Sequence, residues 1–241
     1  CGKRHVMPFP RHHQSGIWAL AVTAFAIGVA EFIVVGVLPA IAADLGVPLA
    51  QAGGLVGFYA LALAIGTPLV VLGLARQPSK PVLLGLVAVF LLGNLVSALS
   101  HSYAMLLAGR IVTAVAHGSF FAIGATVAAQ LAPKGQASRA IALMFAGLTL
   151  AMVVGVPLGS LIGNGLGWRL PFFAVALLAA LGWLATLRWV TDLPARGAGR
   201  ASTQVAALAR PEILAMMSIT ALGFGASFSA FTFITPILTD I

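Results

Sequence analysis

Three polar residues within long apolar stretches could do chemistry inside a membrane: Glu31, Arg110 and His117. Of the five acidic residues in the chain, Glu31 is the only one well inside an apolar run. A charge at membrane depth costs from about 2.5 to well over 10 kcal/mol, so such a residue is by default read as functional. A carboxyl group in this setting suits the loading and release of a proton. The alternative is a structural carboxylate that is permanently paired with a buried base.

Arg110 and His117 lie seven residues apart in LLAGRIVTAVAHGSFFAIG, which places them on nearly the same face of a helix. At 1.5 Å per residue, we expect Glu31 about 15 Å, Arg110 about 10 Å and His117 about 20 Å below the outer surface. The two bases then bracket the acid in depth if both helices line one cavity. Arg110 could pair with the ionised carboxylate or brace the bundle through backbone carbonyls. His117 could exchange protons near neutral pH or make an interhelical hydrogen bond.

The elements that must position these residues are membrane-spanning helices. Hydrophobic residues make up 61% of the 241 residues and charged residues only 7%, and the mean hydropathy is +1.08. No soluble domain of this size could bury so much apolar surface, so the chain is predicted to be an all-α membrane protein in a lipid bilayer. Apolar runs predict spans near 17–42, 51–74, 81–100, 103–127, 138–163, 171–190 and 212–236.

The basic residues indicate topology and do not indicate a nucleic-acid partner. Eleven of the 13 Lys and Arg residues precede the first span or follow an even-numbered span. Arg169 is the one basic residue expected on the opposite side, and Arg110 lies within a span. By the positive-inside rule, the amino terminus and the connections after even-numbered spans are expected in the cytoplasm. No metal or cofactor is expected.

The order of spans predicts half of a larger transporter. Residues 1–16 are expected to be a cytoplasmic segment and 17–190 a six-helix transmembrane domain. A Gly, Arg and Ser-rich cytoplasmic linker follows at 191–211, and 212–241 holds the first helix of an incomplete second domain. The strings LPAIAADL and ITPILTDI end the first and seventh spans, and repeated halves are common in secondary transporters.

The fifth predicted span carries a stripe of small residues. Gly155, Gly159 and Gly163 recur every four residues and provide a smooth surface for close helix approach. Pro157 removes a backbone hydrogen bond within that stripe and is expected to kink the helix. The stripe predicts packing, with which a bending or gating role is compatible.

Taken together, the chain resembles the amino-terminal half of a major facilitator superfamily transporter of the drug:proton antiporter group. It is similar to bacterial members described as arabinose-efflux-permease-like. The matching strings are AEFIVVGVLPAIAADLGV, GRIVTAVAHGSFF, and MFAGLTLAMVVGVPLG followed by GWR. The resemblance extends from about residue 16 to residue 241, and the first and third strings are fairly specific to this subgroup.

The resemblance implies a twelve-helix fold of two six-helix domains, with alternating access driven by proton exchange. It also implies that the carboxyl-terminal half completes the protein. The family's fourth-helix arginine falls on Arg110, and a recurrent acidic coupling residue of the first helix falls on Glu31. The antiporter motif of the family falls on Gly147, Gly155, Pro157 and Gly159.

The loop between the second and third spans departs from the family pattern. It reads GTPLVVLGLARQPSK and keeps Gly66, Gly73, Arg76 and Lys80, but it lacks the acid usually found there. An Asp-based contact between the two halves therefore cannot form in its usual way.

The leading functional hypothesis is proton-coupled efflux of a small drug-like solute, with a sugar or nucleoside exporter as the main rival. Hydrophobic drugs would be favoured by Phe58, Phe120 and Phe228. Hydroxylated solutes would be favoured by Asn94, Gln130 and Ser227.

Other classes fit the sequence less well. A retinal protein needs a lysine in its last span, and no lysine follows Lys134. The sequence contains neither GxSxG nor HExxH, and His117 and Ser119, two residues apart, point to different helical faces, so an enzyme is not expected. A fragment that does not transport by itself remains an alternative, because the expected cavity lies between two halves.

Overall fold

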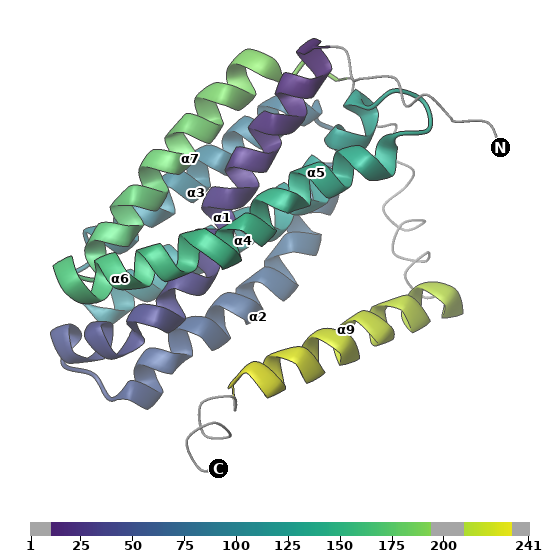
Figure 1. The fold of residues 1–241 in the computed structure, drawn as a ribbon. Helices are drawn as coiled ribbons and strands as arrows, with labels where there is room; N and C mark the ends of the chain where they lie inside the picture. Colours follow the sequence, from purple (N-terminus) through teal and green to yellow (C-terminus); the bar gives the residue numbers. More distant parts are fainter. Residues whose placement is uncertain (1–10, 194–209, 233–241) are drawn as a thin grey trace. The chain divides into compact units, whose positions relative to one another are not determined.

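The computed structural model describes residues 11–193 and 210–232, which are helical with no strand (Figure 1). Six of the described helical segments are long and apolar enough to cross a membrane. The all-α fold and the six spans expected between residues 17 and 190 are therefore confirmed. The helices are α1 (Arg11–Leu45), α2 (Leu49–Gly73), α3 (Ser79–Ala98), α4 (Tyr103–Leu131), α5 (Ala137–Leu150), the π-helical turn η1 (Ala151–Gly155), α6 (Val156–Leu166), α7 (Arg169–Trp189) and α9 (Pro211–Thr232).

Two helices extend beyond the apolar runs from which they were predicted. Among the described residues, α1 is already helical at Arg11, and α4 continues to Leu131. The polar residues that extend each helix include no helix breaker. α4 stops where Ala132 precedes Pro133, and Ala132 has the extended backbone that a following proline favours (φ −77°, ψ 145°).

The contacts within the chain separate two compact units, residues 1–196 and 197–241. The second unit contains α9, which begins at Pro211 and has Glu212 in its first turn. Proline and an acid are both favourable at the start of a helix. Most of the predicted linker and residues 233–236 of the seventh predicted span lie outside the described residues, so this part of the domain organisation stays a prediction.

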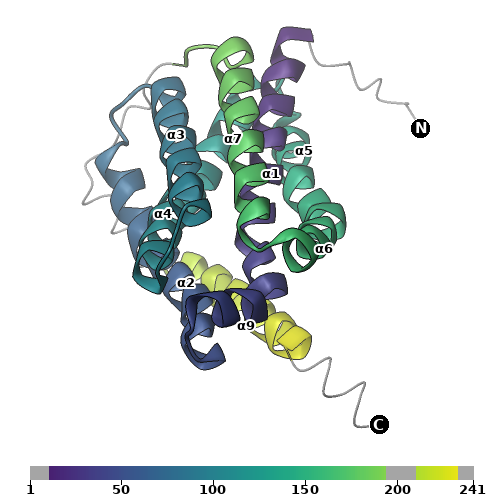
Figure 2. The same cartoon turned by 90° about the vertical axis from the view of Figure 1, so that its left-hand side faces the viewer.

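Within the first unit, α1 is the central helix. It packs against α2, α4, α5, α6 and α7, and Figure 2 shows it between α7 and the segment formed by α5 and α6. A helix that is apolar all round is suited to such a position. Its fully buried residues include Ile27, Ala30, Ile33, Val34 and Val37. The position of α1 therefore depends on the surfaces of these helices and of η1, which it also contacts.

The contact between α1 and the fifth span is built on glycine. Gly147 lies against the Ala21 carbonyl, and Gly155 lies against the side chain of Val29. Gly159 and Gly163 lie in the same way against Ile33 and Val37, one and two turns further along. A side chain at any of these positions would occupy space already filled by α1, so the stripe predicted from sequence serves close packing.

The backbone irregularity expected at Pro157 takes the form of a π-helical turn just before it. The amide of Val156 donates to the carbonyl of Ala151, five residues earlier. Proline supplies no N–H and crowds the preceding turn, so one wider turn accommodates it within a continuous span. Such turns are one recognised cause of helix kinks.

A polar cluster joins three segments at the end of the bundle where α1 terminates. Arg169 lies 2.7 Å from Asp44, and its Nε and Nη2 donate to the Ser100 carbonyl at 3.2 and 2.9 Å. The Trp168 indole donates to the same Asp44 oxygen at 3.1 Å. Arg169 was noted in the sequence only for its side of the membrane. Here it ties the end of α1 to the α3–α4 connection and to the start of α7.

We predict that Gly147→Ala destabilises the protein, because the new Cβ would meet the Ala21 backbone carbonyl, which cannot rotate away. The expected loss is about 1–3 kcal/mol, as for other overpacked sites. Thermal unfolding of the full-length protein in detergent would measure it. In Gly165→Ala, where an added Cβ meets nothing within 4 Å, the melting temperature should stay the same or rise. Equal melting temperatures for both variants would contradict the packing described for Gly147.

Candidate functional site

The candidate site is centred on Glu31, about halfway along α1. Its side chain is 26% exposed, although Ile27, Ala30 and Val34 around it are fully buried. The carboxylate therefore lies at the edge of the packed interior and retains access to the surroundings of the bundle. This position differs from that of a permanently buried structural acid.

His117 of α4 approaches the Glu31 carboxylate. Its Nε2 atom lies 3.9 Å from Oε2 of Glu31, which is longer than a hydrogen bond but within reach of a small side-chain movement or one bridging water. The His117 ring is almost fully buried and contacts the edge of Phe121, with ring centroids 5.2 Å apart. Packing therefore holds the imidazole close to the carboxylate.

Tyr59 of α2 holds the other side of the imidazole. Its hydroxyl lies 2.9 Å from Nδ1 of His117, and the tyrosine is only 4% exposed. In the neutral tautomer of His117 with the proton on Nε2, this nitrogen faces the Glu31 carboxylate, which is an acceptor. Nδ1 then accepts a hydrogen bond from the Tyr59 hydroxyl. Tyr59, His117 and Glu31 thus form a short polar series across α2, α4 and α1.

Arg110 binds the backbone of α1 next to this series. Nη1 donates to the Ala30 carbonyl at 2.7 Å, and Nη2 donates to the Glu31 carbonyl at 3.4 Å. The guanidinium carbon lies 3.9 Å from the centre of the Tyr59 ring, a cation–π distance. Nε has no hydrogen-bond partner among the described residues. Arg110 is buried, so its charge is balanced by carbonyl dipoles, an aromatic face and the nearby acid.

The structure brings together the three residues proposed from sequence. Two interpretations of Arg110 were open, and in the structure its guanidinium binds backbone carbonyls of α1. His117 is the base that faces the Glu31 carboxylate. Tyr59 was missed. The signal was present, because the chain has only two tyrosines and this one interrupts an apolar run. Buried phenol groups usually have hydrogen-bond partners.

The remaining predicted residues lie elsewhere. Gly147, Gly155, Pro157 and Gly159 belong to the fifth span and pack against or shape the segment beside α1. Arg76 and Lys80 lie at the connection between α2 and α3. Within residues 11–193 and 210–232, no three His, Cys, Asp or Glu side chains come together as metal ligands would.

The residues considered for solute contact have different environments. Phe58 is 49% exposed on α2. Phe120 and Asn94 are buried within the bundle, and Asn94 donates to the Phe90 carbonyl at 2.8 Å. Gln130 is exposed near the end of α4. The side chains of Ser227 and Phe228 are outside the described part of the structure.

Comparison with known proteins identifies relatives of the whole chain. The family model "Major Facilitator Superfamily" matches residues 20–241. The inner membrane transport protein YdhP of Escherichia coli is 40% identical over 226 residues, covering 92% of this chain and 57% of that protein. A chloramphenicol resistance protein of Streptomyces lividans is 39% identical over 244 residues, covering 97% and 59%. The putative transporter AraJ of E. coli is 33% identical over 225 residues, covering 93% and 57%.

Solved structures support the same fold. The crystal structure of the peptide transporter POT in complex with sulfate superposes with a TM-score of 0.65 at 14% sequence identity, covering 92% of this chain and 46% of that one. The chain thus spans a little over half the length of the curated relatives and about half of this solved transporter.

Arg110→Lys should lower stability, because an ammonium cannot bind two successive α1 carbonyls while lying flat on Tyr59. We expect a loss of about 1.5–3 kcal/mol, the range for hydrogen bonds made by a charged group. Thermal unfolding of the full-length protein would detect this as a lower melting temperature. The matched control is Arg139→Lys at an exposed position of α5, which should change little. A similar effect for the two substitutions would show that Arg110 does not brace the helices.

Proposed function

Because the chain belongs to the Major Facilitator Superfamily, we propose that the protein containing it is an efflux transporter that exchanges protons for a small drug-like solute by alternating access. The observation that carries the proposal is the approach of His117 Nε2 to Glu31 Oε2 at 3.9 Å, in a site that is partly open. The family and the transporter names of the relatives supply the coarser function. The ion, the direction of transport and the solute are the proposed parts.

In this proposal, Glu31 carries the coupling proton. A carboxylate at membrane depth is expensive unless it is neutralised, so protonation and solute binding can alternate at one place. When the two side chains move closer than in this structure, Nε2–H of the neutral His117 ring donates a hydrogen bond to the ionised carboxylate, and this bond is lost when Glu31 takes up the coupling proton. Tyr59 holds Nδ1, which keeps Nε2 directed at the acid.

Arg110 supplies a constant positive charge beside the exchanging proton. Its two bonds to α1 carbonyls keep the guanidinium in place whether Glu31 is charged or neutral. The remaining Nε donor is buried and has no partner among the described residues, so in this proposal it serves as a donor for the nearby Glu31 carboxylate. A fixed cation and a titrating acid together allow the net charge of the site to change by one unit in each cycle.

The solute is proposed to be apolar or amphiphilic. One relative is named a chloramphenicol resistance protein, which supports export of a drug-like compound. Asn94, one of the residues that would suit a hydroxylated solute, is buried and bonded within α3, whereas Phe58 is exposed. A sugar or nucleoside exporter of the same fold remains the alternative, and a panel of candidate solutes would separate the two.

Further parts of the proposal concern the whole protein. The basic residues favour a cytoplasmic amino terminus. The bacterial relatives, one of which is named an inner membrane transport protein, support a location in a bacterial inner membrane. A carboxyl-terminal half is proposed to complete the solute cavity, because the chain spans about half of the relatives it matches. The chain by itself would then not complete a transport cycle.

Glu31→Gln in the full-length protein should abolish proton-gradient-dependent efflux, with a decrease of at least about tenfold, since the amide cannot bind and release a proton. Expression and melting temperature should stay near those of the unmodified protein, because the side chains have nearly the same volume. The measurement is drug efflux from proteoliposomes with an imposed pH gradient, with Gln51→Glu on an exposed position of α2 as a control for charge. Unchanged efflux would remove Glu31 from the mechanism.

Tyr59→Phe should alter the pH dependence of transport without removing the aromatic face that contacts Arg110. The loss of the hydroxyl removes the donor that stabilises an unprotonated Nδ1, so the tautomer with the proton on Nε2 becomes less favourable. We expect a threefold to tenfold lower rate, about 0.7–1.4 kcal/mol in activation free energy. Nitrogen-15 NMR of labelled histidine would report the tautomer directly. The same tautomer populations in both proteins would refute this role of Tyr59.

A further inference from the structure

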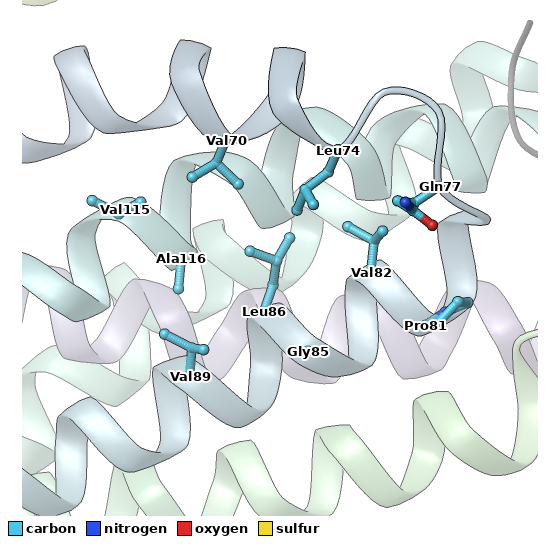
Figure 3. A pocket seen from close by; sticks show the side chains of 10 residues that line it. All are labelled: Val70, Leu74, Gln77, Pro81, Val82, Gly85, Leu86, Val89, Val115 and Ala116. Carbon is cyan, nitrogen blue, oxygen red and sulfur yellow. The ribbon is translucent and has the colours of Figure 1, made fainter. Parts of the chain in front are cut away.

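An apolar groove runs between α2 and α3 at the end of the bundle where these helices are connected. Both helices pack extensively against α4, but they scarcely touch each other. The space left between them has a volume of about 510 Å³, and Val115 and Ala116 of α4 form its floor (Figure 3). Val70 and Leu74 line one side, and residues of α3 line the other.

The groove is suited to a hydrocarbon chain. Nine of its ten lining residues carry no polar side-chain atom, and the exception, Gln77, lies at the connection between the helices. Gly85 widens it, because a Cβ added there would meet nothing within 4 Å. Along α3 the lining extends from Pro81 to Val89, a distance of about 12 Å at 1.5 Å per residue. These features favour an extended apolar chain over a compact polar ligand.

Two cations stand at the connected end of the groove. Arg76 immediately precedes the lining residue Gln77, and Lys80 immediately precedes Pro81. Neither forms an ion pair within the described part of the chain, and the sequence has no acid between Asp44 and Asp192. The groove therefore has an apolar lining and, at one end, two positive charges without an acidic partner among the described residues. An anionic lipid has the complementary arrangement, with an apolar chain and a negative headgroup.

We propose that this groove is a binding site for an anionic phospholipid, with one acyl chain between α2 and α3 and the phosphate at Arg76 and Lys80. The hydrocarbon contacts Val70, Val82 and Leu86 on both sides instead of lying against a single flat surface. The phosphate replaces the acid that is missing from this connection. Binding by this site does not involve Glu31, so its failure would leave the proposed transport function untouched.

The test is native mass spectrometry of the delipidated full-length protein, titrated with phosphatidylglycerol or with phosphatidylcholine carrying the same acyl chains. The first phosphatidylglycerol should bind about thirtyfold more tightly, as two cations near an anionic headgroup would produce. Substituting both basic residues, Arg76→Gln with Lys80→Gln, should abolish this preference while leaving phosphatidylcholine binding unchanged.

A second pair of variants tests the acyl-chain part of the site. Gly85→Leu fills the groove from an open position and should weaken the binding of phosphatidylglycerol about tenfold. Gly57→Leu, at an exposed glycine of α2 where an added Cβ also meets nothing within 4 Å, should leave it unchanged. Equal affinity for the two lipids in the unmodified protein, or full phosphatidylglycerol affinity in Gly85→Leu, would overturn the proposal. The latter result would mean that the lipid lies elsewhere or that another part of the protein covers the groove.

Discussion

The arrangement of the first unit depends on one buried cation bound to the backbone of another helix. Arg110 donates to two successive carbonyls of α1, at Ala30 and Glu31, and lies over the ring of Tyr59. A guanidinium in this position is stabilised only where several acceptors converge, because its desolvation costs several kcal/mol. The same contacts that satisfy it fix the rotation and height of α1 relative to α4. Glu31 and His117 are thereby placed opposite each other.

The helix that Arg110 holds is also the one that the rest of the unit surrounds. Glycines of the fifth span allow α1 to approach at backbone distance, and the π-helical turn before Pro157 keeps that span continuous. At the far end, Arg169 and Trp168 bind Asp44 and close the contact with α7. The nearly all-apolar helix α1 is therefore kept in one position by two features. Glycines pack against one of its sides, and polar contacts bind it at Arg110 and at Asp44. Lipid offers no hydrophobic force that could do so.

Much of this architecture was predictable because membranes impose simple rules on a sequence. Long apolar runs identified six spans correctly, although α1 and α4 extend beyond them, and α4 ends only where Pro133 follows. Glu31, Arg110 and His117 stood out because polar groups are rare at such depth. Tyr59 did not stand out, since a phenol can lie at many positions in an apolar helix, and only its distance from His117 gives it a role.

The amino-acid sequence by itself determined that the chain crosses a membrane, where its spans lie and which polar groups must find partners there. These properties follow from the composition of the chain and from the length of its apolar runs, so they can be derived without knowing which helices are neighbours. The tertiary structure alone decided that Arg110 binds carbonyls of α1, that His117 is the base beside the carboxylate and that Tyr59 completes the series. It also left α2 and α3 apart over α4. Such pairings depend on how helices rotate and approach in three dimensions, and spacing along one chain does not specify them.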